Sequence, residues 1–311
     1  MTKPKNLKKS VPKSKGQSRG QDSAAVDTTK TADPESLSQS DGKKSLNNRF
    51  RDFEELLSLD RWLGDFLLTL GFFTRLPAPM DDETAKRPLA KAVWAFPIIG
   101  VVIGVFGGAV LAVGNNVGVP PLGAALLAIA TMICLSGALH EDGLADCADG
   151  LWSGADTPKR LAIMRDSRIG AFGVIALILI IGLKAVAIGK LATVGGSWST
   201  VLAIVAAASL SRGLLPVAML LMPLARDDGR AANAGAPTQQ DAIIAAGLAA
   251  LICLLCLGFS AGVIAVLIGA GLATLFLLQA LKRVGGYTGD VLGASQQILE
   301  ATTLLVASSV L

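Results

Sequence analysis

The chain has 311 residues, of which 52% are hydrophobic and 17% are charged, and its mean hydropathy is +0.56. That is too apolar for a water-soluble domain of this length. The net charge is only +4, four cysteines are scattered along the chain and we find no nucleic-acid-binding motif, so a disulfide-rich secreted domain and a nucleic-acid-binding protein are both excluded.

Residues 1–46 are polar and rich in lysine and arginine, without the apolar core of a signal peptide. We expect a disordered tail there, because such a composition cannot bury a core. Its basic start is compatible with contacts to anionic lipid, but a solvated tail without a specific partner is the simpler interpretation. Residues 47–311 are predicted to form one membrane-embedded domain.

Apolar residues recur with roughly helical spacing over residues 47–73, but Asp60, Arg61 and Asp65 interrupt them. The uninterrupted part is too short to cross a bilayer, so we expect an interfacial or re-entrant helix. A shorter apolar segment at 297–311 ends the chain, and longer ones between predict an all-α, multi-pass transmembrane helical bundle of about 6–8 membrane helices. The predicted spans are residues 89–113, 120–139, 169–191, 199–222, 241–260 and 262–281.

The links between these segments differ in polarity. Two spans separate each polar link from the next, so all the polar links lie on one side of the membrane. The positive-inside rule places that side in the cytoplasm, because these links carry arginines and lysines. The polar links are residues 74–88, 140–168, 223–240 and 282–296, and the short uncharged links are near 114–119, 192–198 and 260.

Three aspartates, Asp142, Asp146 and Asp149, follow the second predicted span at positions i, i+4 and i+7. On a helix they share one face, where like charges repel one another. A bound divalent cation is the simplest compensation, and oxygen ligands suit Mg²⁺, which usually accompanies phosphate. The alternative, acids that favour a helix N-terminus, does not account for acids two turns further on. The pattern therefore predicts a Mg²⁺ site.

His140, the only histidine, directly precedes this acidic stretch. It is a candidate general base at neutral pH. The alternative is a histidine at the membrane interface that orients a carboxylate.

A second polar patch, Arg165-Asp166-Ser167-Arg168, stands at the start of the next span. Arginines at a helix N-terminus are suited to clamp phosphates in bidentate geometry. The alternative is a pair of ordinary membrane-flanking arginines. The compact spacing favours phosphate binding.

Arg212 interrupts an otherwise apolar span. An arginine in such a position usually pairs with an acid or lines a polar cavity, and we favour a functional cavity over a structural ion pair. The candidate partners are Asp142, Asp146, Asp166 and Asp290.

A glycine-rich loop near the C-terminus contains Gly286, Tyr287 and Thr288 and ends at Asp290. Its backbone amides are suited to cradle a phosphate. It lacks the Lys-Ser/Thr pair of a P-loop, so by itself the loop is only weak evidence for a phosphate-binding site.

Four blocks, in this order, resemble the signature blocks of the cobalamin synthase family: G-A-L-H-E-D-G-L-A-D-C-A-D-G-L, R-D-S-R-I-G-A-F-G, S-R-G-L-L-P and G-G-Y-T-G-D-V-L-G-A-S-Q-Q. F-F-T-R-L-P and F-P-I-I-G fit the N-terminal part of the same pattern. The resemblance runs from residue 60 to the C-terminus. Cys147 and Ala171 stand where the family pattern favours threonine, and neither departure removes a charged group.

The resemblance implies an Mg²⁺-dependent membrane enzyme of vitamin B12 biosynthesis that joins adenosylcobinamide-GDP to α-ribazole, or its 5′-phosphate, and releases GMP. It implies the bacterial inner membrane, small-molecule substrates, lipid contacts and no nucleic acid, and it leaves a homo-oligomer or contacts with other enzymes of the pathway open. The implied metal ligands are Asp142, Asp146 and Asp149, the catalytic residues are Asp146, His140, Asp166 and Asp290, and the substrate-binding residues are Arg165, Ser167, Arg168, Arg212, Gly286, Tyr287 and Thr288.

Two other classes fit the sequence less well. CDP-alcohol phosphotransferases also carry aspartates on a membrane helix, but their D-G-x-x-A-R motif needs an arginine that does not follow Asp142-Gly143 here. A cation-coupled transporter would place ionisable groups near the bilayer midplane. The charges of this chain are instead expected at the cytoplasmic ends of its helices.

Overall fold

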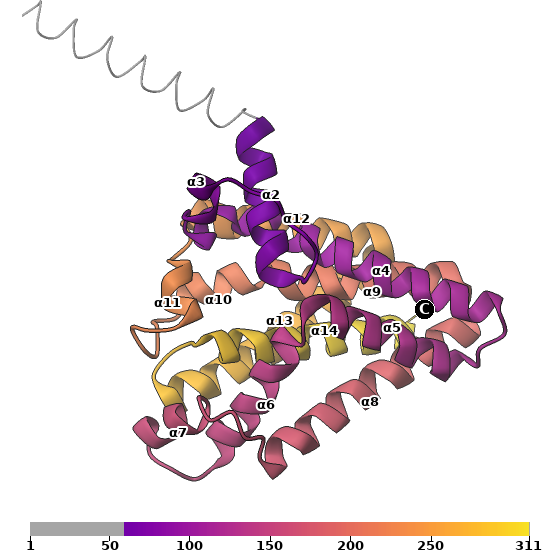
Figure 1. The fold of residues 1–311 in the computed structure, drawn as a ribbon. Helices are drawn as coiled ribbons and strands as arrows, with labels where there is room; N and C mark the ends of the chain where they lie inside the picture. Colours follow the sequence, from indigo (N-terminus) through magenta and orange to yellow (C-terminus); the bar gives the residue numbers. More distant parts are fainter. Residues whose placement is uncertain (1–58, 311) are drawn as a thin grey trace, which may run out of the picture. The chain divides into compact units, whose positions relative to one another are not determined.

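A computed structural model describes residues 59–310, and in this part of the chain every named element is a helix (Figure 1). The tail predicted at 1–46 and the beginning of the helix predicted at 47–73 lie outside the described residues. The helices are α2 (Leu59–Phe73), α3 (Asp82–Ala85), η1 (Leu89–Ala95), α4 (Phe96–Asn116), α5 (Pro121–Ser136), α6 (Leu139–Trp152), α7 (Thr157–Ile163), α8 (Ala171–Val194), α9 (Gly196–Gly213), α10 (Leu215–Leu221), α11 (Arg230–Ala234), α12 (Gln239–Leu257), α13 (Phe259–Val284) and α14 (Gly289–Val310).

The predicted all-α multi-pass bundle is confirmed. Within residues 59–310, five helical segments are long and apolar enough to cross a membrane. The predicted span at 120–139 is α5, which passes the same test only together with α6, and the two are bent by 91°. The five segments are Leu89–Asn116, Ala171–Val194, Gly196–Leu221, Gln239–Leu257 and Phe259–Val284.

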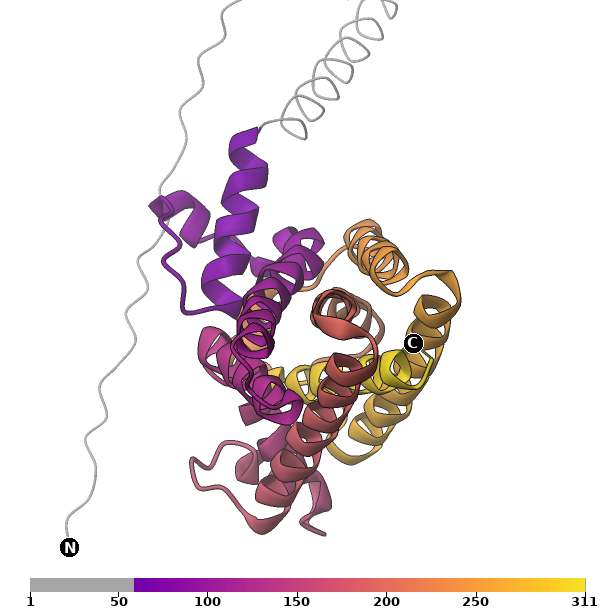
Figure 2. The ribbon, with the colours of Figure 1, turned by 90° about the vertical axis from the view of Figure 1, so that its right-hand side faces the viewer.

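Helix α9 is the centre of the bundle, packed against α4, α12, α14 and α8 (Figure 2). Glycines on α4 allow its close approach to α9. A Cβ at Gly100 would lie 2.3 Å from the carbonyl oxygen of Ala208, and one at Gly104 would lie 2.7 Å from Cα of Val205. Small residues at the contact let two backbones approach each other, as is common for helices packed in lipid.

The C-terminal helix differs from the prediction. A short apolar segment was expected at 297–311, but α14 begins at Gly289 and is buried against α6, α13, α9 and α8. Its polar residues, among them Gln296 and Glu300, face the interior and have hydrogen-bond partners there. A hydropathy pattern misses such a helix because its buried face is polar.

Two residues in the left-handed conformation produce the bend between α5 and α6. Gly137 has φ 63° and Ala138 has φ 56°. Glycine is required at the first of these positions, because a Cβ there would lie 2.2 Å from Nε of Arg75. The bend turns the acidic helix α6 away from the axis of α5.

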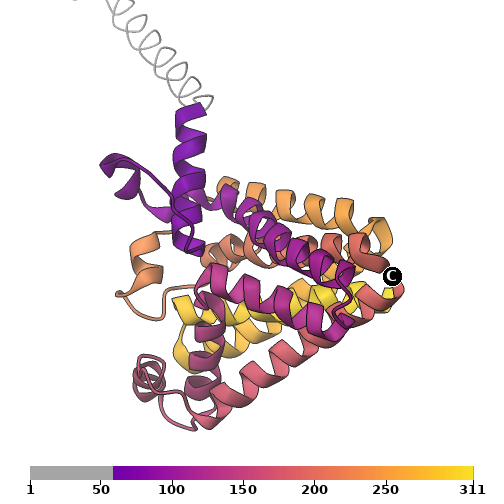
Figure 3. The same cartoon turned by 45° about the vertical axis from the view of Figure 1, so that its right-hand side comes forward.

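The helices α3, α7 and α11 gather at one end of the bundle, and the C-terminus lies at the other (Figures 1 and 3). This is the arrangement that the alternation of polar and uncharged links predicts. The acidic helix α6 also belongs to the polar end, so the chemistry-bearing segments named from the sequence lie near one another.

Candidate active site

The acidic stretch forms a helix, α6, as predicted. Asp142 is exposed, and Asp146 and Asp149 are partly buried. Asp149 is used by the next span: Gly170 N–H donates to its Oδ2 over 2.7 Å and Gly173 N–H donates to its Oδ1 over 3.0 Å. These are free amides of the first turn of α8, so Asp149 acts as a cap for that helix.

The structure does not assemble the predicted three-aspartate metal site. Among the described residues, no group of three or more His, Cys, Asp or Glu side chains is placed to hold a metal ion. In the same part of the chain, the carboxylates of Asp142 and Asp146 have no hydrogen bond or ion pair, whereas both carboxylate oxygens of Asp149 are engaged. Mg²⁺ is usually bound by one or two carboxylates together with substrate phosphates, and Asp142 and Asp146 fit that arrangement.

A cavity of about 300 Å³ opens beside the first turn of α6. Its aromatic wall consists of Phe72, Phe73, Phe96 and His140, with apolar neighbours from η1 and α10. Its charged wall consists of Asp142, Arg226, Arg230 and Asp290.

The charged wall is tied together by ion pairs. Arg226 Nη2 lies 3.6 Å from Asp290 Oδ2, and Arg226 Nε lies 3.6 Å from Asp228 Oδ1. Thr288 Oγ1 also donates to Asp290 Oδ2 over 3.2 Å. A Cβ at Gly143 would lie 2.9 Å from Cα of Asp290, so that glycine lets α6 pack directly on the backbone of α14.

His140 belongs to the aromatic wall and is only 2% exposed. Its ring stacks on Phe73, with centroids 5.6 Å apart and an interplanar angle of 19°. Neither of its nitrogens has a hydrogen-bond partner among the described residues. The alternative in which His140 orients a carboxylate is therefore not supported.

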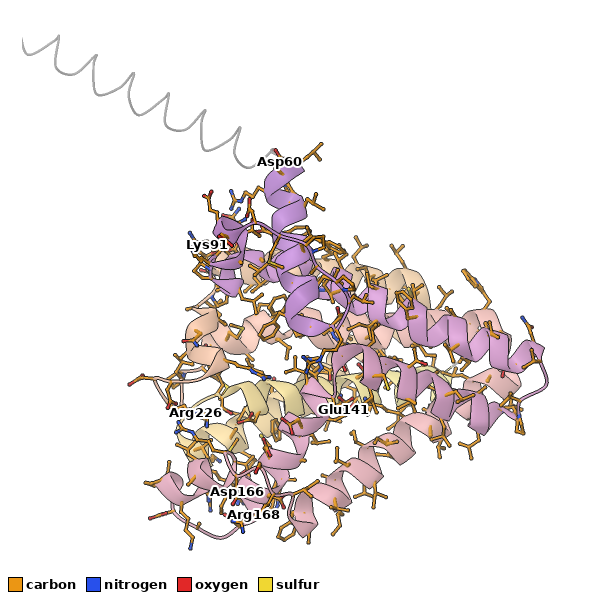
Figure 4. The ribbon with its side chains drawn as sticks, viewed as in Figure 1. Asp60, Lys91, Glu141, Asp166, Arg168 and Arg226 are labelled. Carbon is orange, nitrogen blue, oxygen red and sulfur yellow. The ribbon has the colours of Figure 1, made fainter. Side chains whose placement is uncertain are left out.

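The predicted phosphate clamp does not line the cavity. Arg168 donates to its neighbour Asp166 from Nε (3.0 Å) and Nη2 (2.7 Å), and this hydrogen bonding lowers the pKa of Asp166 to about 2. Arg165 instead pairs with Asp228. Asp166, Arg168 and Arg226 lie at the same end of the bundle (Figure 4). Phosphate binding by Arg165, Ser167 and Arg168 stays a prediction.

The glycine-rich loop has a structural role. Gly286, Tyr287 and Thr288 are buried. Tyr287 N–H donates to the carbonyl of Pro223 over 2.9 Å, and Ala225 N–H donates to the carbonyl of Tyr287 over 3.0 Å. The amide of Tyr287 is thus not available to a phosphate. The loop holds the segment that leads into Arg226. Substrate binding by Gly286, Tyr287 and Thr288 stays a prediction.

Arg212 does not pair with any of the four aspartates proposed from the sequence, so that expectation was wrong. Its Nη1 lies 3.2 Å from Oε2 of Glu300, and Lys184 Nζ lies 2.7 Å from Oε1 of the same carboxylate. All three side chains are buried. Apart from Arg212, charges were expected at the helix ends, but these three form an ion network inside the bundle, in which two cations share one carboxylate.

Amide side chains extend this network toward α6. Gln296 Nε2 donates to Glu300 Oε2 (2.6 Å) and to Ser211 Oγ (2.9 Å). Gln297 Nε2 donates to Glu141 Oε1 over 2.9 Å, and Figure 4 shows Glu141 within the bundle. The network therefore links α9 and α14 to the residue next to Asp142.

Sequence reasoning missed two kinds of residues. Arg226 and Arg230 were counted only as loop charges, although the run R-D-D-G-R directly after a span is a signal for a charged wall. Lys184 was overlooked inside an apolar segment, and Glu300 was overlooked inside a segment taken as simply apolar. An ionisable residue in such a position is a reason to look for its partner.

A family model described as cobalamin-5-phosphate synthase matches residues 65–308. A relative from Bradyrhizobium diazoefficiens named adenosylcobinamide-GDP ribazoletransferase is 42% identical over 248 residues, which cover 79% of this chain and 94% of the relative. Relatives of the same name from Mesorhizobium japonicum and Azorhizobium caulinodans are 44% and 40% identical, over 81% and 79% of this chain and 95% of each relative. No solved structure matches the chain at a significant level.

Proposed function

The chain belongs to the cobalamin-5-phosphate synthase family, and on that premise we propose that it is an adenosylcobinamide-GDP ribazoletransferase. A ribose hydroxyl of α-ribazole, or of its 5′-phosphate, attacks the pyrophosphate phosphorus that bears the cobinamide. A new P–O bond forms there, the bond from that phosphorus to the bridging oxygen breaks, and GMP leaves with the bridging oxygen. The hydroxyl proton passes to a base. Because the chain belongs to this family, we no longer consider the two alternatives, a CDP-alcohol phosphotransferase and a cation-coupled transporter.

One observation carries this proposal: in a chain of this family, Asp142 lines one cavity together with Arg226 and Arg230, and its carboxylate has no partner among the described residues. Asp146, whose carboxylate also has none, follows one turn later on α6. Arg226 and Arg230 line the cavity and would bind the pyrophosphate oxygens. Asp142 and Asp146 would hold Mg²⁺, and a metal ion there would supply charge neutralisation for the pyrophosphate and the leaving GMP. Holding donor and acceptor in one cavity also makes the attack effectively intramolecular.

We assign Asp290 as the acceptor of the hydroxyl proton. Its carboxylate lines the cavity, and the guanidinium of Arg226 and the hydroxyl of Thr288 fix its orientation. Asp166 is a poor candidate, because its hydrogen bonds with Arg168 hold its pKa at about 2 and it does not line the cavity.

We also propose that the polar end of the bundle faces the cytoplasm of a bacterial inner membrane. The links at this end carry Arg165, Arg226, Arg230 and Lys282, and the positive-inside rule favours cytoplasmic exposure of such links. The soluble nucleotide substrate and GMP then enter and leave on the side where nucleotides are present.

The test is GMP release by the purified full-length protein in detergent, given adenosylcobinamide-GDP and α-ribazole 5′-phosphate with and without Mg²⁺. We expect GMP and a cobalamin product in equal amounts, and no turnover after chelation of divalent ions. Absence of product in protein that elutes as a folded particle would contradict the assigned activity. Equal turnover in chelator would contradict the metal assignment alone.

A further inference from the structure

We propose that the aromatic wall of the cavity binds the flat heteroaromatic base of the acceptor nucleoside, with His140 as its one hydrogen-bonding partner. This inference rests on the proposed function, and it assigns the two walls to different substrates. The charged wall takes the pyrophosphate of the donor, and the aromatic wall takes the base of α-ribazole.

The aromatic wall offers ring faces and edges on which a flat ring can pack from the cavity side. Phe73 and His140 stack nearly parallel, and Phe96 meets Phe73 edge-on, with centroids 4.7 Å apart and an interplanar angle of 86°. Leu215 and Met219 from α10 add an apolar side. Such a surface favours an aromatic group through stacking and burial of apolar area.

His140 is the second observation that points to a ligand. The side chain lines the cavity and is 2% exposed, yet neither nitrogen has a partner among the described residues. A buried polar group without a partner is unfavourable, and in native structures it calls for an explanation. A ligand that accepts a hydrogen bond from the imidazole N–H would supply the missing partner.

The chemistry of the wall selects this base over the guanine of the donor. In a benzimidazole nucleoside one ring nitrogen carries the sugar, which leaves a single acceptor on the base. Guanine carries several donors and acceptors around its edge, and apart from His140 the side chains of the aromatic wall are phenylalanines. Guanine would therefore lose most of its hydrogen bonds there, whereas benzimidazole would lose none.

The helix geometry keeps the two substrates apart. His140 and Asp142 both line the cavity but are two residues apart on α6, so they point in widely different directions. The base would lie on one side of the first turn of α6 and the pyrophosphate on the other.

The test combines direct binding and kinetics on the full-length protein in detergent. The fluorescence of α-ribazole reports its binding to wild type and to His140→Phe, which keeps the stack and removes the hydrogen bond. We expect His140→Phe to raise the Kd for α-ribazole about tenfold, the scale of one lost hydrogen bond, and to leave the KM for adenosylcobinamide-GDP within about twofold. Phe106→Leu, an exposed aromatic residue of α4 outside the cavity, is the control and should leave both unchanged.

A competition on wild-type protein needs no variant and covers the case in which His140→Phe does not fold. Guanosine should not displace α-ribazole, and unsubstituted benzimidazole riboside should. Displacement by guanosine, or an unchanged Kd for α-ribazole in folded His140→Phe, would overturn the inference. Binding of α-ribazole without GMP release would instead contradict the proposed function and leave the base site standing.

Discussion

Glu300 is the carboxylate shared by the buried ion network. It accepts hydrogen bonds from Lys184, Arg212 and Gln296, and all four side chains are buried. A buried ion network contributes little net free energy over apolar packing, but removing one member leaves an uncompensated charge. Its role is thus to fix one arrangement of α8, α9 and α14.

Replacing Glu300 by Gln should destabilise the protein strongly, because two cations would then share no anion. We expect the free energy of unfolding in mixed micelles to fall by about 3–5 kcal/mol. Glu83→Gln, at an exposed position in α3, is the matched control and should change it by less than about 0.5 kcal/mol. A Glu300→Gln protein as stable as wild type would mean that the network is not a coupled unit.

Asp146→Asn should lower Mg²⁺-dependent kcat/KM by on the order of 100-fold, the scale of losing one electrostatic contact to the transition state. The carboxylate has no protein partner among the described residues, so its removal should hardly alter stability. GMP release and thermal unfolding measure the two effects. Asp82→Asn, an exposed carboxylate of α3, serves as the control. Full turnover with unchanged Mg²⁺ dependence would exclude Asp146 as a ligand.

Asp149→Asn separates a helix cap from a metal ligand. The carboxylate accepts two amide hydrogen bonds from the first turn of α8, and an asparagine oxygen retains at most part of them. We expect about 1 kcal/mol less stability and an unchanged Mg²⁺ concentration for half-maximal turnover. If the Mg²⁺ requirement rises as much as in Asp146→Asn, the three-aspartate ligand set predicted from the sequence is correct after all.

The spacing of the aspartates predicted a helix with a shared face, and α6 confirms it. The partners were not predictable, because Asp149 contacts glycines 21 and 24 residues away and Arg212 contacts a glutamate 88 residues away. Helical periodicity describes one element at a time. It does not say which face of another element lies opposite.

At the scale of elements, the 285–288 loop and the 223–225 segment act as one unit. Their backbones pair through Tyr287, and a Cβ at Gly286 would lie 2.2 Å from the carbonyl oxygen of Pro223. The segment runs directly into Arg226, so its position sets that of the charged wall. The loop thus positions the charged wall, whether or not its backbone also contacts a phosphate as the sequence predicts.

Gly286→Ala should therefore displace the charged wall, although Gly286 itself does not line the cavity. The added methyl group forces the two segments apart and so displaces Arg226. We expect the KM for adenosylcobinamide-GDP to rise about tenfold, because a group that binds substrate loses much of its effect when it is misplaced. The KM for α-ribazole should change less, because its wall is built by α2, α4 and α6. Gly271→Ala on α13, where a Cβ meets no atom within 4 Å, is the control. Equal KM values in wild type and Gly286→Ala would argue against this coupling.

Helix existence was predictable where apolar runs are long, as in α4, α8, α12 and α13. For α14, whose buried face is polar, the predicted segment begins at residue 297, whereas the helix begins at Gly289. The α5–α6 bend, where Gly137 and Ala138 adopt left-handed conformations, was not predicted. Glycine permits the left-handed conformation at residue 137, but nothing in the local sequence Ser-Gly-Ala demands that the following alanine adopt it too.

At the scale of the whole molecule, the separation between polar and uncharged ends supports a single orientation in the membrane. The segments α3, α7 and α11 lie at one end, while the links after α4 and α8 lie at the other (Figure 3). Both nucleotide substrate and product are charged and do not cross lipid. An active site on the cytoplasmic side is the orientation that gives them access.

Cysteine labelling in intact cells tests this orientation. Val117→Cys in the link after α4 is 73% exposed and should react with a membrane-impermeant maleimide added from outside. Asp82→Cys at the start of α3, also exposed, should react only after the membrane is disrupted. Cys147 and Cys253 are buried, and labelling of the unsubstituted protein gives the background from the exposed Cys134 and the partly exposed Cys256. If only Asp82→Cys is labelled in intact cells, the active site lies outside the cytoplasm and the positive-inside assignment is wrong. If both variants are labelled in intact cells, α4 does not cross the membrane.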